Sequence, residues 1–170
     1  DRVVTVNGVS KGFAMTGWRL GFIGAPQEIA TACDKLQGQI TSGTCSISQR
    51  AAIAALDSDP AQMEEMAQMK KAFQSRRDNL LEMLNAIPGF KTNIPEGAFY
   101  LFPDVSAYFG TKYNADTIND SVDLSMYLLN DAGVALVPGS AFGSPECLRI
   151  SYATSMDVLE QAVGQIKSSL

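Results

Sequence analysis

One segment of the chain constrains the fold more than any other, because it predicts a single long helix with a signal at each end. Asp59 is a preferred N-cap residue, Pro60 occupies the first helical position, and Gln62 stands where a capping-box partner is expected. Pro88 and Gly89 end the segment. Apolar residues recur at helical spacing between these signals, at Met63, Met66, Met69, Phe73, Leu80, Leu84 and Ile87. The pattern predicts a helix over 60–87 that buries this face, with the methionines as core packing.

Shorter helices and strands are predicted on both sides of this helix. Periodicity and β-branched content predict strands at 2–7, 18–25, 98–102, 134–137 and 147–152. The helical pattern predicts helices at 27–40, 47–56, 122–131 and from 156 onward. Strands mixed with helices favour an α/β fold. The two strands at the start have few neighbours for a sheet, so we expect further sequence upstream of them.

Composition excludes several kinds of site. The 170 residues contain no histidine, which excludes Ser/His and Cys/His nucleophile pairs and histidine metal ligands. The widely spaced cysteines at 33, 45 and 147 favour neither a disulfide framework nor a zinc site; we expect a reducing, cytoplasmic setting. A net charge of −5 disfavours a nucleic-acid partner. No apolar run approaches the ~20 residues of a membrane span, so no membrane partner is expected.

A lysine and an arginine near the N-terminus form the first candidate site. Lys11 lies between small residues and an apolar Phe-Ala-Met run, and Arg19 follows eight residues later. A lone loop lysine is usually a solvated surface charge, but apolar walls and a nearby cation can keep a lysine amine unprotonated and able to attack a carbonyl carbon. Arginine suits bidentate binding of a phosphate. A lysine that can form a Schiff base and a phosphate-binding arginine are the minimum set for pyridoxal phosphate.

Arg149 is the second candidate, in the last expected strand. Alternation along this strand predicts that Leu148, Ile150 and Tyr152 face the core. Cys147, Arg149 and Ser151 are then expected to face the other side. From periodicity alone, a surface arginine and an arginine that fixes the carboxylate of an amino acid both remain open.

Four motifs along the chain share their order and spacing with one protein family. Residues 8–21 contain Ser10-Lys11, with Arg19 eight residues after the lysine and an apolar residue and Gly21 after the arginine. Segments 95–100 (PEGAFY), 137–143 (VPGSAFG) and 148–153 (LRISYA) follow. Together they resemble the C-terminal portion of class I/II pyridoxal-phosphate-dependent aminotransferases of fold type I, and residues 8–21 look like the bacterial aspartate aminotransferase branch. The resemblance covers all 170 residues.

The resemblance implies a fold, a reaction and a role for each candidate residue. It implies the C-terminal part of the cofactor-binding large domain over 1–75 and a small α/β domain over 76–170. Lys11 would hold pyridoxal phosphate and act as the catalytic base, Arg19 would anchor the cofactor phosphate, and Arg149 would bind the substrate carboxylate. The implied enzyme is a cytoplasmic homodimer that moves an amino group from an L-amino acid, with aspartate expected, to a 2-oxo acid, with 2-oxoglutarate expected.

Several further residues are candidates for supporting roles. Phe142 is expected either to line the substrate pocket or to pack its loop, and Tyr100 is expected in the core. By resemblance, Thr41, Ser42 and Thr44 lie in a loop that approaches the partner subunit's active site. In one branch of the family an arginine from this region binds a side-chain carboxylate. No arginine occurs between Arg19 and Arg50, so a dicarboxylate preference has no support from this half.

The chain also lacks several residues that the family uses. In the family, the aspartate on the pyridine nitrogen, a tyrosine, an asparagine and a stacking aromatic residue all precede the lysine loop, and only ten residues precede Lys11 here. We therefore expect the isolated chain to be an inactive fragment. Two alternatives for the whole protein stay open. One is a different fold type I enzyme, such as an alanine or aromatic aminotransferase or a C–S lyase. The other is an aminotransferase-like domain through which a regulator senses a ligand.

Overall fold

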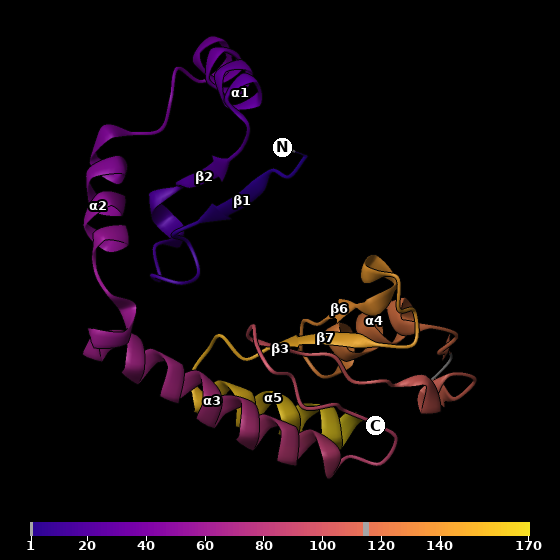
Figure 1. The fold of residues 1–170 in the computed structure, drawn as a ribbon. Helices are drawn as coiled ribbons and strands as arrows, with labels where there is room; N and C mark the ends of the chain where they lie inside the picture. Colours follow the sequence, from indigo (N-terminus) through magenta and orange to yellow (C-terminus); the bar gives the residue numbers. More distant parts are fainter. Residues whose placement is uncertain (1, 114–115) are drawn as a thin grey trace. The chain divides into compact units, whose positions relative to one another are not determined.

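The chain forms two compact units. The computed structural model describes residues 2–113 and 116–170. Contacts within the chain divide it into Asp1–Ala67, here called the N-terminal unit, and Gln68–Leu170, the C-terminal unit. Each unit is described by itself, and Figure 1 labels the elements of both. None of the helices in the described residues is both long enough and apolar enough to cross a membrane.

The N-terminal unit is built on an antiparallel hairpin followed by two helices (Figure 1). Strands β1 (Thr5–Gly8) and β2 (Gly21–Gly24) pair with Gly8 opposite Gly21. Helices α1 (Gln27–Ile40) and α2 (Ser46–Asp57) confirm the two predicted helices. The predicted second strand is shorter than expected, because a 3₁₀ turn, η1 (Thr16–Trp18), occupies its start.

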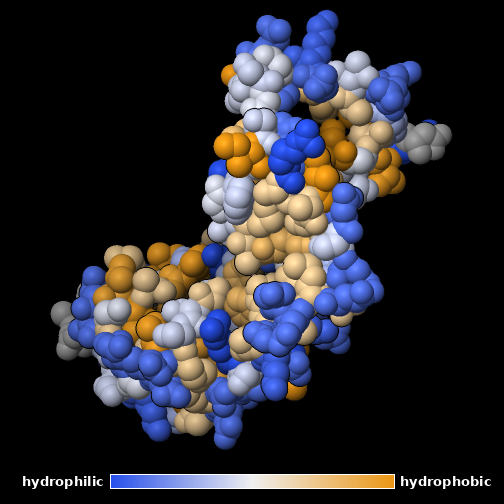
Figure 2. Space-filling view, turned by 90° about the vertical axis from the view of Figure 1, so that its left-hand side faces the viewer, coloured by the Kyte–Doolittle hydropathy of each residue, from blue (hydrophilic) through white to orange (hydrophobic). Residues whose placement is uncertain are grey.

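Few apolar side chains are buried within the N-terminal unit. Val9 and Ala52 are its buried apolar residues in the part of the chain that the structure describes. Large apolar side chains remain exposed on the strands and on both helices, as at Val6, Leu36 and Ile47. Figure 2 shows hydrophobic residues at the surface of this unit. This unit therefore has little apolar core of its own. Apolar burial is the dominant stabilising term in folding, so the unit by itself lacks most of that stabilisation.

The C-terminal unit surrounds a three-stranded antiparallel sheet. Strand β7 (Leu148–Ser151) lies in the centre, between β3 (Tyr100–Leu101) and β6 (Val137–Pro138). The helices are α3 (Glu64–Asn85), which runs on from the N-terminal unit, α4 (Ser121–Asp131) and α5 (Met156–Ser169). Short 3₁₀ turns η3 (Ser106–Tyr108) and η4 (Gly139–Phe142) and a small hairpin, β4 (Lys112–Tyr113) with β5 (Asp116–Thr117), complete the unit.

This sheet and the helices enclose one apolar core. Fully or almost fully buried members come from every layer, among them Leu80, Leu84, Leu101, Leu124, Leu128, Leu148, Ile150, Leu159 and Ile166. The helix predicted from residue 156 onward is confirmed as α5, in which Leu159, Val163 and Ile166 are buried. Figure 1 shows α3 and α5 along one side of the sheet. The core therefore supports β7 from the face that carries Leu148 and Ile150.

Two expectations for this region need correction. The long helix begins at Glu64 rather than at residue 60, because Asp59 caps a separate 3₁₀ turn, η2 (Pro60–Gln62), through a hydrogen bond of 3.0 Å from the Ala61 amide. Cys147 is buried although alternation placed it on the outer side of its strand. Cys147 directly precedes β7 and forms an isolated β-bridge with Asp104, so the backbone segment around Asp104 covers it.

The turn η4 depends on a glycine. A Cβ atom at Gly139 would overlap the carbonyl oxygens of Ser144 and Cys147. The amide of Gly139 donates to the Cys147 carbonyl over 2.7 Å. The backbone approaches itself so closely here that no side chain fits, and this approach sets the path of the loop that carries Phe142.

We expect Gly139→Ala to lower the free energy of unfolding of the full-length protein by about 1–3 kcal/mol, the usual cost of forcing extra atoms into a packed site. Urea unfolding followed by circular dichroism measures this change. Gly164→Ala is the matched control, because nothing lies within 4 Å of a Cβ at that helical glycine, and alanine is the better helix former there. Equal stability of the two variants would contradict the steric argument.

Candidate functional site

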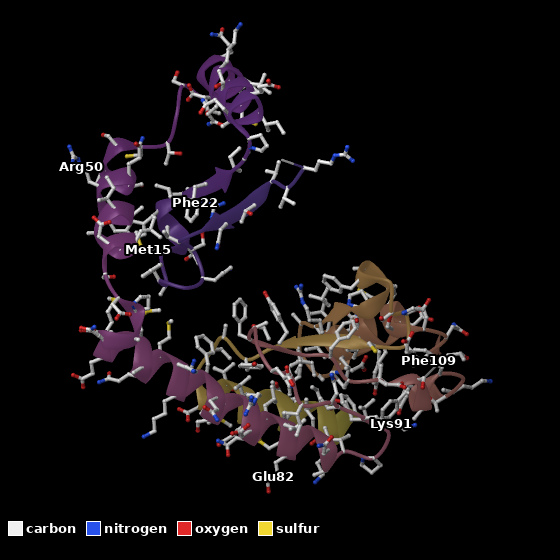
Figure 3. All side chains as sticks on the ribbon, viewed as in Figure 1. Met15, Phe22, Arg50, Glu82, Lys91 and Phe109 are labelled. Carbon is white, nitrogen blue, oxygen red and sulfur yellow. The ribbon has the colours of Figure 1, made fainter. Side chains whose placement is uncertain are left out.

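Lys11 and Arg19 lie in the same connection, residues 9–20, between β1 and β2. The pairing of Gly8 with Gly21 brings the two ends of this connection together. A Cβ at Gly8 would come within 3.0 Å of the Leu20 carbonyl oxygen, so the close approach of the strands favours glycine there. The hairpin thus presents both candidate residues on one loop. Figure 3 labels Met15, which belongs to the same loop.

The lysine half of the loop is anchored by one apolar residue. Val9 is fully buried, and its carbonyl accepts a hydrogen bond of 3.2 Å from the Phe13 amide. The Lys11 carbonyl accepts from the Ala14 amide over 3.3 Å, and Ala14 has a left-handed φ of 54°. These bonds form a tight turn in which the Lys11 side chain is exposed.

Arg19 has a backbone conformation that the sequence did not predict. The sequence predicted Arg19 at the start of a strand. Instead it follows η1 with φ 51° and ψ 52°, a left-handed backbone conformation that residues other than glycine rarely adopt. Its Nη1 atom donates to the Thr16 carbonyl oxygen over 3.1 Å. No carboxylate among the described residues forms an ion pair with Arg19. The guanidinium is therefore held by its own loop and keeps donors for an external anion.

The chemistry of these two groups fits pyridoxal phosphate. A primary amine is the group that binds an aldehyde carbon covalently, and a guanidinium matches a phosphate bidentately. Both stand on one loop within the N-terminal unit. The residues present thus provide a covalent attachment point and a phosphate donor.

Arg149 lies in the central strand of the sheet in the C-terminal unit. Leu148 and Ile150 on either side of it are buried, and Arg149 itself is half-buried. This alternation confirms the predicted orientation of the strand. In the register of the sheet Arg149 lies opposite Val137 of β6, and Ser151 lies opposite Tyr100 of β3.

Two aromatic rings contact the Arg149 guanidinium. Its central carbon lies 4.5 Å from the centroid of Tyr100 and 4.5 Å from that of Phe142. Phe142 is half exposed. The centroids of the Phe142 and Phe102 rings lie 6.1 Å apart in a T-shaped arrangement. Tyr100 was expected in the core but is half-buried against the arginine. Sequence reasoning missed this contact because strand periodicity gives no register between β3 and β7, which only the folded sheet sets.

The segment before Tyr100 is held by Tyr152. The Tyr152 hydroxyl donates to the Ala98 carbonyl oxygen over 3.1 Å, and its amide donates to the Phe99 carbonyl over 2.9 Å. Burial raises the pKa of Tyr152, which keeps the hydroxyl protonated as a donor. Ala98 has a left-handed φ of 61°. The Tyr152 bonds fix a turn that Ala98 alone would not favour.

Thr41, Ser42 and Thr44 lie in the connection between α1 and α2. Their expected role at a partner subunit stays a prediction. Among the described residues, no group of three or more Cys, Asp, Glu or His side chains is placed to hold a metal ion.

Comparisons with known protein families and with known proteins both find aminotransferases. The pattern of the family described as "Aminotransferase class I and II" matches residues 1–166. An aspartate aminotransferase of Pinus pinaster is 51% identical over 171 residues, which cover 100% of this chain and 35% of that protein. A "bifunctional aspartate aminotransferase and glutamate/aspartate-prephenate aminotransferase" of Petunia hybrida is 53% identical, covering 100% of this chain and 36% of that protein.

A solved structure matches the fold as well. The crystal structure of the aspartate aminotransferase of Rhizobium meliloti superimposes with a TM-score of 0.93 at 44% identity, over 99% of this chain and 42% of that one. The chain therefore spans between 35% and 42% of the length of these three proteins. The predicted α/β fold, as part of a fold type I enzyme, is confirmed. Matched over nearly its whole length by the family pattern and by related folds, the chain belongs to the class I and II aminotransferases.

Proposed function

We propose that the full-length protein transfers the amino group of aspartate to 2-oxoglutarate with the help of pyridoxal phosphate. The observation that carries the proposal is the placement of Lys11 and Arg19 on one hairpin connection. Membership of the aminotransferase family and relatives named aspartate aminotransferases support the reaction class.

Lys11 and Arg19 hold the cofactor in this proposal. Lys11 would hold the cofactor through its side-chain amine, and the Arg19 guanidinium would donate hydrogen bonds to the phosphate. When bound, pyridoxal phosphate supplies an electron sink that makes the substrate Cα–H bond acidic. The hydrogen bond from Arg19 to Thr16 couples the position of the phosphate donor to the loop that also carries Lys11.

Lys11 also moves a proton in this proposal. The Lys11 amine would take the proton from the substrate Cα atom and deliver it to the C4′ carbon of the cofactor.

Arg149 orients the substrate. Its N–H fork matches the two oxygens of the substrate α-carboxylate, which would fix the orientation of the bound amino acid. Arg149 forms no ion pair with a carboxylate in the described residues, so the substrate carboxylate has no competitor from them.

A second acceptor is worth testing. One relative, at 53% identity, is named for transfer to prephenate as well as for aspartate aminotransferase activity. Prephenate is also a 2-oxo acid with a carboxylate for Arg149. Assaying purified full-length protein with aspartate and either 2-oxoglutarate or prephenate decides between the acceptors. The same panel with alanine, aromatic amino acids and cystathionine tests the other fold type I reactions, and a protein that binds these ligands without turnover would point to a regulator.

The assignment of residues 1–75 to the cofactor domain and 76–170 to the small domain is part of the proposal. So are a homodimeric assembly and a cytoplasmic location. Size-exclusion chromatography with light scattering tests the homodimeric assembly. Family resemblance supports the domain division and the dimer, and the widely spaced cysteines support the location.

Replacing Lys11 with alanine is expected to abolish transfer from aspartate. Loss of positioned proton transfer alone costs about 10²–10⁴-fold in rate, and the covalent hold on the cofactor is lost as well. Borohydride reduction followed by peptide mapping should label Lys11 in the wild type. Lys35→Ala on the exposed face of α1 is the matched control and should keep full activity. Borohydride labelling of another lysine would contradict the assignment.

Replacing Arg149 with leucine is expected to lower kcat/KM for aspartate while cofactor binding stays intact. A hydrogen bond to a charged group contributes about 1.5–3 kcal/mol, so the loss is roughly 10- to 150-fold or more. Steady-state kinetics and the visible absorbance of the bound cofactor measure the two effects. Arg76→Leu is the control, because Arg76 also lies over an aromatic ring, that of Phe73, at 5.5 Å. An unchanged kcat/KM for Arg149→Leu would rule out its role.

The 170-residue chain by itself is expected not to transfer amino groups. It spans about two fifths or less of its relatives, and its N-terminal unit buries few apolar side chains. Added pyridoxal phosphate would bind weakly, if at all. Turnover at the rate of the full-length protein, measured with material of confirmed mass, would refute this expectation.

A further inference from the structure

We propose that Tyr100 and Phe142 are positioning residues for Arg149: their rings hold the guanidinium in place without occupying its N–H donors. The inference rests on the proposed function, in which Arg149 binds the substrate carboxylate. It adds two residues that set the affinity of that site.

The two rings reach Arg149 from opposite flanks of its strand. Tyr100 belongs to β3 and Phe142 ends the turn that follows β6, while β7 lies between β3 and β6. Each centroid is 4.5 Å from the guanidinium carbon, within the range of a cation–π contact. A long, flexible arginine side chain is thereby restrained on both sides.

The chemical type of the group that holds Arg149 matters as much as the restraint that it provides. A carboxylate would hold an arginine by filling its N–H donors, and it would then compete with the substrate. Arg77 illustrates that case, since it binds Asp78 at 2.7 Å and donates to the Pro95 carbonyl over 3.2 Å. Aromatic faces attract the cation through the ring quadrupole and leave the donors available. No carboxylate in the described residues forms an ion pair with Arg149.

Each ring is itself supported. The pairing of Tyr100 with Ser151 and the Tyr152 hydrogen bond to Ala98 fix the position of Tyr100. Phe142 packs on Phe102, and the close backbone approach at Gly139 sets its turn. An arginine held before substrate arrives loses less conformational entropy on binding, so the rings should increase affinity.

The first experiment measures steady-state kinetics of the full-length protein. Phe142→Leu and Tyr100→Leu should each raise KM for aspartate about 3- to 30-fold, the range that one cation–π contact spans, with kcat changed far less. Tyr100→Phe keeps the ring and should restore the wild-type KM. Tyr113→Leu is the matched control, because Tyr113 stacks on Tyr127 at 4.6 Å and should leave KM unchanged.

The second experiment needs no catalytic activity. Phenylglyoxal modifies accessible guanidinium groups, and peptide mass mapping follows Arg149 and Arg77 in the same digest. Sodium acetate, the carboxylate probe, should protect Arg149, and its half-protecting concentration should rise about 3- to 30-fold in the leucine variants. Arg77 labelling should stay constant, which would show that the fold is intact.

The outcomes separate the two proposals. Acetate protection that shifts as expected in a protein without aminotransferase activity would refute the proposed function and leave the positioning role standing. Unchanged KM and unchanged acetate protection in Phe142→Leu would overturn the positioning role. Phe142 is 50% exposed, so its loss should not unfold the protein, and this variant decides the question even if Tyr100→Leu fails to fold.

Discussion

The antiparallel pairing of β3, β7 and β6 is the constraint on which the C-terminal unit depends. The central strand turns Leu148 and Ile150 into the core and Arg149 to the other side. Because successive side chains alternate, a shift of one residue in register would bury the charge and expose the apolar pair. Burial of the core residues therefore fixes the side of the sheet on which Arg149 lies.

The sequence predicted most of the helices well, and the surroundings of the three candidate residues less well. The helices over 27–40 and from 156 onward follow from local periodicity, and both are confirmed. The roles of Lys11, Arg19 and Arg149, which a motif suggested, stay proposals. Tyr100 was misplaced because its contact with Arg149 depends on pairing across the sheet.

The conformation of Arg19 shows the same limit. Strand propensity of residues 18–25 predicted an extended backbone, whereas the turn at Thr16–Trp18 leaves Arg19 left-handed with φ 51°. The side chain then folds back to the Thr16 carbonyl. Propensity averages over a window, and a single strained residue inside that window is invisible to it. Positions of this kind often lie at functional sites, where surrounding contacts hold an unfavourable conformation.

The two candidate regions differ in how much chain must be brought together to build them. Lys11 and Arg19 lie on one hairpin connection whose paired ends, Gly8 and Gly21, are close in sequence, whereas the strand of Arg149 needs Leu101 to pair with Ile150. Closing the longer loop costs more conformational entropy. Contacts between residues far apart in sequence therefore form later in folding as a rule. The hairpin that carries Lys11 and Arg19 should accordingly form earlier in folding than the strand pairing that positions Arg149.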